Sequence, residues 1–474
     1  MTSPKKNFIY NVMYQILILI IPLITAPYLS RVVGSEGIGI FSYTYSIVYY
    51  FMLLTLLGVN NYGNREIAKV RDSKKELSKT FWSIYSFQIL MGTLMLIIYI
   101  AYLLLFNIDY KLLSFIEIIY ILSAILDINW FFYGMEEFKK TITRNTILKI
   151  GTLFLIFIFV KKSTDLWKYT LIMASMTLLS QLILWFFMKG KIDFVKIKIK
   201  DIKKHIKPNI ILFIPVIAVS IYKIMDKVML GSLTNINEVG FYENAEKIIN
   251  IPITIIATLG TVMLPRITNM ISNGQKKEVD KYINKSIEFV MFLSRAMCIG
   301  LICVGYDFAP VFFGKEFQKT GILIVLLSIT LPFISFANVI RTQYLIPFGK
   351  DKVYMKSVIY GAISNFIMNL IFIPKFESIG ACIGTITAEI FVMLYQFYYM
   401  RKEYKFGNLF KTIIPFILTS IIMFEVIYPL NYLIPNKIIK ILVQVLVGVI
   451  IYFIFNFKYI NSLVNIKKIL HLKK

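Results

Sequence analysis

The chain has 474 residues, of which 58% are hydrophobic, and its mean hydropathy is +0.71. Soluble domains are usually about 45–50% apolar. The formal net charge is +26, which in a soluble protein would suggest nucleic-acid binding. Here the basic residues lie in short segments between long apolar runs. This composition therefore excludes a soluble domain, argues against a nucleic-acid partner and predicts an all-α polytopic membrane protein.

Apolar runs of spanning length recur from Tyr10 to Phe455. A helix that crosses a bilayer needs roughly 20 residues. The basic start of the chain precedes no small-residue cleavage site, so the first run is predicted to be a retained span rather than a signal peptide. We predict about 14 spans, at residues 10–29, 40–57, 81–105, 112–132, 146–160, 166–188, 209–231, 245–264, 287–312, 322–346, 354–373, 379–400, 413–430 and 438–455.

Lys and Arg alternate between rich and poor loops along the chain. In the first half, the rich loops are residues 58–80, 134–145 and 189–209. Such loops are typically cytoplasmic. An even number of spans then places both termini in the cytoplasm, and anionic lipids of the inner leaflet would add about 1 kcal/mol of attraction per basic residue.

The chain contains a weak internal repeat. VVGSEGIGIFSYTYSI follows the first span and MLGSLTNINEVGFYENAEKI follows the seventh, so Gly34 corresponds to Gly231 and Gly39 to Gly240. An even number of spans in each copy gives a parallel repeat, in which a substrate site lies between lobes that rock against each other. The predicted parts are a six-helix lobe at residues 1–205, a second at 206–403, and two further helices with a tail at 404–474.

The seventh predicted span, Asn209–Gly231, carries Lys223, Asp226 and Lys227. Residues three and four apart share one helix face. A charge within a span costs roughly 2.5–3.5 kcal/mol on insertion scales, so it usually faces a water-filled cavity or a partner. The alternative is an ion pair near the outer surface that only shapes the adjoining loop.

The sequence carries no enzyme signature. The cysteines Cys298, Cys303 and Cys382 lie in or beside apolar runs, and His205 and His471 are isolated in basic loops. These spacings support neither a metal site nor a disulfide framework. Phosphate loops and histidine-based dyads are also missing from the sequence. We therefore expect a protein without a cofactor that is not an enzyme.

Five segments together resemble the oligosaccharide flippases of the O-antigen and capsule type. They are ITAPYLSRVVGSEGIGIFSY, LGVNNYGNREIAKVR, DINWFFYGMEEFKKTITRN, YKIMDKVMLGSLTNINEVGFYENAEKI and TVMLPRIT. The superfamily also holds multidrug and toxin extrusion transporters and lipid II flippases. The resemblance implies two six-helix lobes, a central cavity and outward movement of polyprenyl-diphosphate-linked sugars by alternating access.

The diphosphate of such a substrate needs cations, because unpaired anionic oxygens are costly in a medium of low dielectric. The candidate cavity cations are Lys223, Lys227, Lys247, Arg295 and Arg341. The alternatives are snorkelling for Lys247 and Arg341 and a buried structural pair for Arg295.

Acidic residues in or beside spans would couple transport to H⁺ or Na⁺, or hydrogen-bond to a neighbouring helix. The candidates for coupling or for pairing with a lysine are Asp226, Asp127 and Glu389, with Glu117 and Glu425 as further acidic residues. The inner end of the second span matches the family pattern and is predicted to form an inner gate. Its residues are Asn60, Asn64, Arg65 and Glu66. Arg65 alternatively serves as a positive-inside anchor.

The function we predict is a flippase of the bacterial plasma membrane that moves undecaprenyl-diphosphate-linked oligosaccharide repeat units outward for surface polysaccharide. Membrane lipids and a polysaccharide polymerase are the candidate partners. The alternatives are a multidrug or ion antiporter, a lipid II flippase, and a membrane-embedded enzyme of polysaccharide assembly. Lipid II flippases typically carry an Arg-Asp pair in the first span, where this chain has Thr25, Ala26 and Pro27.

Overall fold

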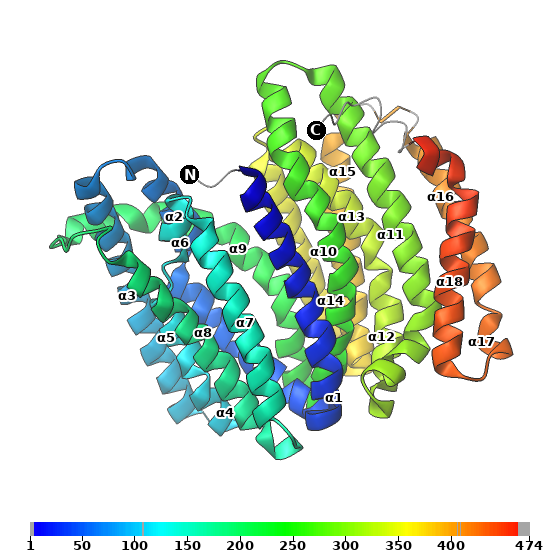
Figure 1. The fold of residues 1–474 in the computed structure, drawn as a ribbon, viewed down its shortest axis with the longest axis horizontal. Coiled ribbons are helices and arrows are strands. Elements are labelled where there is room, and N and C mark those ends of the chain that lie inside the picture. The colour runs from blue at the N-terminus through cyan, green and yellow to red at the C-terminus, as the bar shows by residue number, and fades with distance from the viewer. Residues whose placement is uncertain (1–3, 107–108, 405, 408, 463–474) are drawn as a thin grey trace. The chain divides into compact units, whose positions relative to one another are not determined.

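The computed structural model describes residues 4–106, 109–404, 406–407 and 409–462, and every regular element in these ranges is helical (Figure 1). The chain divides into two compact units, unit 1 at residues 1–240 and unit 2 at residues 241–474. The predicted lobe limits at residues 205 and 403 stay a prediction.

Unit 1 contains α1 (Pro4–Leu56), α2 (Val59–Val70), α3 (Lys74–Leu105), α4 (Lys111–Ile116), α5 (Ile118–Ile125), α6 (Asn129–Gly134), α7 (Phe138–Phe159), η1 (Ser163–Asp165), α8 (Leu166–Met188), α9 (Ile199–Leu233) and the start of α10 (Ile236–Ser272). Unit 2 continues with α11 (Lys276–Phe312), η2 (Lys315–Phe317), α12 (Gln318–Ser328), α13 (Thr330–Val339), η3 (Ile340–Leu345), α14 (Asp351–Phe376), α15 (Ser378–Met400), α16 (Leu409–Ile427), α17 (Leu430–Leu433) and α18 (Lys437–Phe455).

The described residues contain 12 helices that are long and apolar enough to cross a membrane, or up to 13 if the bent pair Lys315–Ser328 and Thr330–Leu345 forms one span. The stretch Ile20–Val70 is counted once, although the sequence predicts two spans there. The prediction of an all-α polytopic membrane protein is confirmed, whereas the number 14 is not.

Glycine at position 34 divides α1 into two parts. Gly34 has φ 71° and ψ −179° in the middle of this long helix. Glycine adopts such angles at no steric cost because it has no Cβ. The sequence predicted separate spans at residues 10–29 and 40–57, with a connection of about ten residues between them. The structure instead confines the break to one residue, and the helix resumes at Ser35.

The predicted span at residues 112–132 matches a candidate span at Lys111–Gly134, but its helix is broken into α4, α5 and α6. Side chains of neighbouring helices satisfy the carbonyls that the second break leaves free. Gln88 donates to the carbonyls of Ala124 at 2.8 Å and of Asp127 at 2.9 Å. Trp185 donates to the carbonyl of Leu126 at 3.0 Å. Broken helices are tolerated at membrane depth only when the protein supplies such donors.

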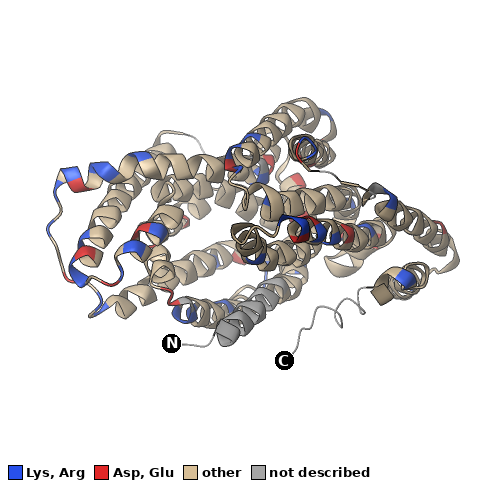
Figure 2. Ribbon diagram, turned by 90° about the horizontal axis from the view of Figure 1, so that it is seen from above, with Lys and Arg blue, Asp and Glu red and all other residues tan. Residues whose placement is uncertain are grey.

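Salt bridges join the three basic loops of unit 1. The pairs are Arg71–Glu136 at 2.8 Å, Lys74–Asp193 at 2.7 Å, Lys79–Asp201 at 3.3 Å and Lys191–Glu137. Figure 2 shows the charged residues of unit 1 in blue and red where these segments come together. The loops therefore share one end of unit 1, as the alternation of charge requires. The side of the membrane on which they lie stays a prediction.

An aromatic cluster holds α2, α3 and α6 of unit 1 together. The rings of Trp130 and Phe81 stack at 5.3 Å between centroids, and both side chains are fully buried. The Trp130 indole donates to Gln88 at 3.1 Å. A Cβ added at Gly63 would lie 2.6 Å from the Trp130 ring. Trp130 thus fills the space that a glycine on α2 leaves open.

We expect Trp130→Ala to lower the free energy of unfolding by about 3–5 kcal/mol, because it empties a fully packed site. Thermal unfolding of the detergent-purified protein measures this loss. The control is Phe186→Ala, since Phe186 is 79% exposed on α8. Equal midpoints for the two variants would contradict the packing described for this cluster.

Candidate functional site

The charged face of α9 lies in unit 1 beside the second part of α1. Lys223 is exposed, Lys227 is half-buried, and Asp226 is buried. The charges of Asp226 and Lys227 act on the hydroxyl of Tyr50, which itself donates to the carbonyl of Ser220 at 3.4 Å. The structure therefore brings these three predicted residues together on one segment, with Asp226 turned inward and Lys223 outward.

Two glycines form a close crossing between α1 and the start of α10. A Cβ added at Gly39 would lie 2.0 Å from the carbonyl oxygen of Ile236, and one added at Gly240 would lie 2.1 Å from that of Ser35. Ile236 lies four residues before Gly240, and Ser35 lies four residues before Gly39. The contact between the two helices is therefore reciprocal. The Ser35 hydroxyl donates to the side-chain oxygen of Asn237 at 2.8 Å.

This Gly39–Gly240 crossing joins the two glycines that the internal repeat identifies as equivalent. Their reciprocal geometry is what two copies of one element produce when they meet about a twofold axis. The other predicted pair is not equivalent in conformation. Gly34 breaks α1, whereas Gly231 lies within α9, where a Cβ would meet the Tyr43 ring at 2.2 Å.

The predicted inner-gate residues lie on α2, close to the basic end of unit 1. Asn60 and Arg65 are exposed, and Asn64 and Glu66 are half-buried. The Glu66 carboxylate accepts hydrogen bonds from Lys69 at 2.8 Å and Arg65 at 3.2 Å. The guanidinium of Arg65 also lies 5.6 Å from the ring centroid of Tyr62. A gating role for this group stays a prediction.

The Asp127 carboxylate stabilises the helix break before α6. It accepts hydrogen bonds from the backbone and the side chain of Asn129, at 2.8 and 2.7 Å. Asn129 in turn accepts from Arg144 at 3.0 Å, and Arg144 donates to the carbonyl of Ser180 at 2.8 Å. This network links α6, α7 and α8, so Asp127 has a structural partner, and ion coupling by it stays a prediction.

The predicted sites of unit 2 lie on four different elements. Lys247 on α10 pairs with Glu243 at 3.4 Å and donates to Asn244 at 3.3 Å. Arg341 in η3 lies 5.6 Å from the ring centroid of Tyr354. Glu389 on α15 is buried. Near Arg341, Lys350 donates to Glu403 and holds the pKa of that carboxyl below its usual range.

Arg295 has no ion pair within the described part of the chain, and it is the one candidate cation there with a buried nitrogen atom that lacks a partner. It lies near the middle of α11 and is half-buried. Its Nε atom is buried and has no hydrogen-bond partner. A buried guanidinium normally pairs with a carboxylate or phosphate. The Nε atom of Arg295 therefore lacks the partner that such a group normally has.

Unit 2 contains an apolar cavity of about 350 Å³ between α10, α11, α16 and α18. Its lining includes Ile255, Met297, Val304, Met423 and Val449. Such a cavity is suited to hydrocarbon rather than to a polar ligand.

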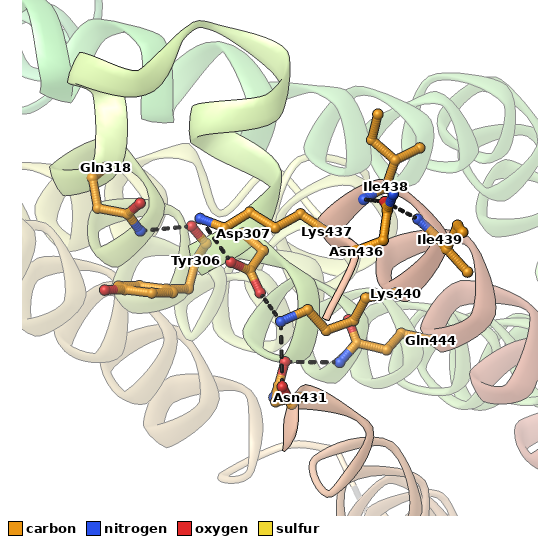
Figure 3. Close-up of polar contacts among 10 residues, drawn as sticks. All are labelled: Tyr306, Asp307, Gln318, Asn431, Asn436, Lys437, Ile438, Ile439, Lys440 and Gln444. Carbon is orange, nitrogen blue, oxygen red and sulfur yellow. Dashed lines mark hydrogen bonds and ion pairs between the residues drawn. The ribbon is translucent and has the colours of Figure 1, made fainter. Parts of the chain in front are cut away.

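A polar cluster adjoins the cavity through Gln444, and Figure 3 shows the side chains of this cluster. Gln444 lines the cavity and donates to the side-chain oxygen of Asn431 at 3.0 Å. Lys440, one turn away, pairs with Asp307 at 2.6 Å, and Lys437 pairs with the same carboxylate at 3.3 Å. The buried Lys440 is thus neutralised within unit 2, in contrast to Arg295.

The prediction that His205 is an isolated loop residue is wrong, because His205 lies in α9. The structure buries His205, and its ring nitrogens hydrogen-bond with the hydroxyls of Tyr62 at 2.7 Å and Ser83 at 2.8 Å. His205 therefore joins α9 to α2 and α3. The sequence also did not predict that Arg144 on α7 hydrogen-bonds to Asn129 on α6 and Ser180 on α8. A lone histidine or arginine in a basic segment gives no signal of such contacts.

Comparisons with known proteins agree on a family. A family model described as "Polysaccharide biosynthesis protein" matches residues 5–271, more than half of the chain. A protein of Escherichia coli (strain K12) named "Putative O-antigen transporter" is 24% identical over 409 residues, which cover 85% of this chain and 97% of the relative.

Two solved structures share the fold. The inward closed conformation of the lipid II flippase MurJ has a TM-score of 0.78 at 21% identity, covering 97% of this chain and 99% of that one. The inward-facing conformation of a multidrug resistance MATE family transporter of the MOP superfamily has a TM-score of 0.60 at 13% identity, covering 83% and 99%. At these identities the likeness establishes the fold alone.

We expect Gly39→Ala to open the Gly39–Gly240 crossing, because the new Cβ meets a backbone carbonyl that cannot rotate away. In a background without the native cysteines, Ser35→Cys should react with a water-soluble maleimide several-fold faster when Gly39→Ala is also present. The control is Gly151→Ala, where a Cβ has ordinary contact with Met176 at 3.4 Å. The three proteins compared are Ser35→Cys alone, Ser35→Cys with Gly39→Ala, and Ser35→Cys with Gly151→Ala. Equal labelling rates would contradict a crossing that is too tightly packed to admit the maleimide.

Proposed function

Because this chain belongs to the polysaccharide biosynthesis protein family, we propose that it is a flippase for lipid-linked oligosaccharide. Its substrate is an undecaprenyl-diphosphate-linked repeat unit, which it moves from the inner to the outer face of a bacterial plasma membrane by alternating access. The multi-pass helical fold and the name of the Escherichia coli relative support this proposal. We also propose that the protein is a transporter without enzymatic activity.

The observation that carries the proposal is Arg295. A guanidinium near the middle of a membrane helix without an acidic partner in the described residues is costly unless an anion binds there. A diphosphate supplies that anion and can accept two parallel hydrogen bonds from the guanidinium. A cationic drug would instead require a carboxylate at such a position, which disfavours the multidrug alternative.

The remaining parts of the substrate have matching environments. The apolar cavity between α10, α11, α16 and α18 suits a segment of the polyprenyl chain. In unit 1, Lys223 and Lys227 on α9 carry further positive charge. A membrane potential that is negative inside favours outward movement of an anion by about 2.3 kcal/mol per charge per 100 mV.

In a deletion strain, we expect complete lipid-linked repeat units to accumulate on the cytoplasmic face and the wild-type gene to relieve this. Arg295→Ala should reduce the rescued flux roughly 10- to 100-fold, because a hydrogen bond to a charged group is worth about 1.5–3 kcal/mol. Arg295→Lys should retain part of the flux, and weaker losses are expected for Lys223→Ala, Lys227→Ala and Arg341→Ala.

Mass spectrometry of lipid-linked units, with a membrane-impermeant label for the outer face, makes this measurement. The control is Lys352→Ala, since Lys352 is exposed at the start of α14. Incomplete units in the deletion strain would indicate an assembly enzyme. Normal flux in Arg295→Ala would exclude that residue from the substrate path.

Filling the apolar cavity should impair transport of long-chain substrates. A Cβ added at Gly300 has only Met423 nearby, at 3.8 Å, so Gly300→Leu can extend into the cavity without a backbone clash. We expect slower flipping of full-length lipid-linked oligosaccharide and unchanged flipping of a short-chain analogue. Rates in proteoliposomes test this, with Gly151→Leu on α7 as the control. Equal slowing of both substrates by Gly300→Leu would contradict a chain-binding role.

A further inference from the structure

Glu117 is a membrane-embedded carboxyl group that the proposed function does not use. It lies in unit 1 between α4 and α5, and its side chain is fully buried. The Oε1 atom is 2.8 Å from the hydroxyl of Thr44 on α1. The Oε2 atom is buried and has no hydrogen-bond partner in the described residues. One half of this carboxyl group is therefore without any donor.

The Thr44 hydroxyl has more than one acceptor within hydrogen-bond distance. The Thr44 hydroxyl lies 3.0 Å from the carbonyl oxygen of Ile40, four residues earlier in the helix. Threonine in a helix commonly donates its proton to that carbonyl. A hydroxyl has only one proton, so Thr44 donates either to Glu117 Oε1 or to a backbone carbonyl. When it donates to the carbonyl, the 2.8 Å contact needs a protonated Glu117 as its donor.

The charge environment agrees with a neutral Glu117. The titratable side chains that face it are tyrosines, namely Tyr99 on α3 and Tyr120 on α5. Tyr45 on α1 and Tyr169 on α8 complete this group around Tyr120. Within the described ranges, no lysine or arginine forms a salt bridge with Glu117. Ionising a carboxyl group in such surroundings is costly.

Thr44 and Gly39 lie on the same part of α1, so Thr44 connects Glu117 to the helix that forms the Gly39–Gly240 crossing. Thr44 lies five residues beyond Gly39 on the second part of α1. The adjacent Tyr43 packs on Gly231 of α9 and lies 3.2 Å from the Ser232 hydroxyl. A movement of this segment that opens the crossing would therefore withdraw Thr44 from Glu117.

We propose that Glu117 is a proton-binding site, protonated while the Gly39–Gly240 crossing is closed. When α1 moves and water reaches the carboxyl group, the O–H bond of Glu117 breaks, water takes the proton, and a carboxylate remains. Reclosure requires the carboxylate to take up a proton again. This proposal rests on the proposed function only in that the movement accompanies transport of the lipid-linked substrate.

The first experiment is infrared spectroscopy of the purified full-length protein at neutral pH. We expect a carbonyl stretching band of a protonated carboxyl group that is lost in Glu117→Gln, a change that keeps the shape of the neutral acid. Thr44→Val, which leaves Glu117 in place, should shift this band because it removes the acceptor. The control is Glu36→Gln, since Glu36 is exposed on α1. An unchanged band in Glu117→Gln would overturn the proposal.

The second experiment measures flipping in proteoliposomes with and without an imposed pH gradient. We expect a gradient to change the wild-type rate several-fold and to leave the Glu117→Gln rate unaltered, with Glu36→Gln behaving as the wild type. An undiminished gradient effect in Glu117→Gln would overturn a role in coupling. Absence of flipping by the wild type would contradict the proposed function instead, while the infrared band would still decide whether Glu117 holds a proton.

Discussion

A polar group inside a membrane has no water to bind, so its partner must come from the protein or from the substrate. Most of the described structure obeys this constraint internally. Gln88 satisfies the carbonyls of a broken helix, Asn129 satisfies Asp127, and Asp307 neutralises Lys440. Arg295 and Glu117 do not fit this pattern. Their uncompensated groups are the reason for assigning them to the diphosphate and to a proton.

The internal repeat gives these sites a mechanical context. Gly39 and Gly240 occupy equivalent positions in the two copies and meet reciprocally, with backbone atoms too close for any side chain. The same segment of α1 carries Thr44, which contacts Glu117. In the proposal made for Glu117, this helical segment would link the state of the crossing to the protonation of that residue. Alternating access requires an element of this kind, with two arrangements that a ligand can bias.

The sequence predicted the membrane class, the common end of the basic loops and the equivalence of Gly39 and Gly240, because hydrophobicity and glycine spacing are local signals. It did not predict the broken helix around Asp127 or the burial of His205. Both depend on side chains distant in sequence, such as Gln88 with Ala124 and His205 with Ser83. Arg295 was a candidate because it lies within a predicted span, and only the structure distinguishes this unpaired cation from the paired Lys247.

The proposal that this chain moves a lipid-linked oligosaccharide across a bilayer can be tested with the purified protein. The direct measurement uses liposomes that contain the purified protein and a fluorescent polyprenyl-diphosphate-linked oligosaccharide, with a membrane-impermeant reductant added outside. The account predicts that the reductant bleaches nearly all of the fluorescence, because inner-leaflet substrate is delivered to the outer leaflet, and that the recovered lipid is chemically unchanged. Liposomes without the protein should lose only the fluorescence of their outer leaflet. The same partial loss in liposomes that contain the protein would contradict the proposed flipping.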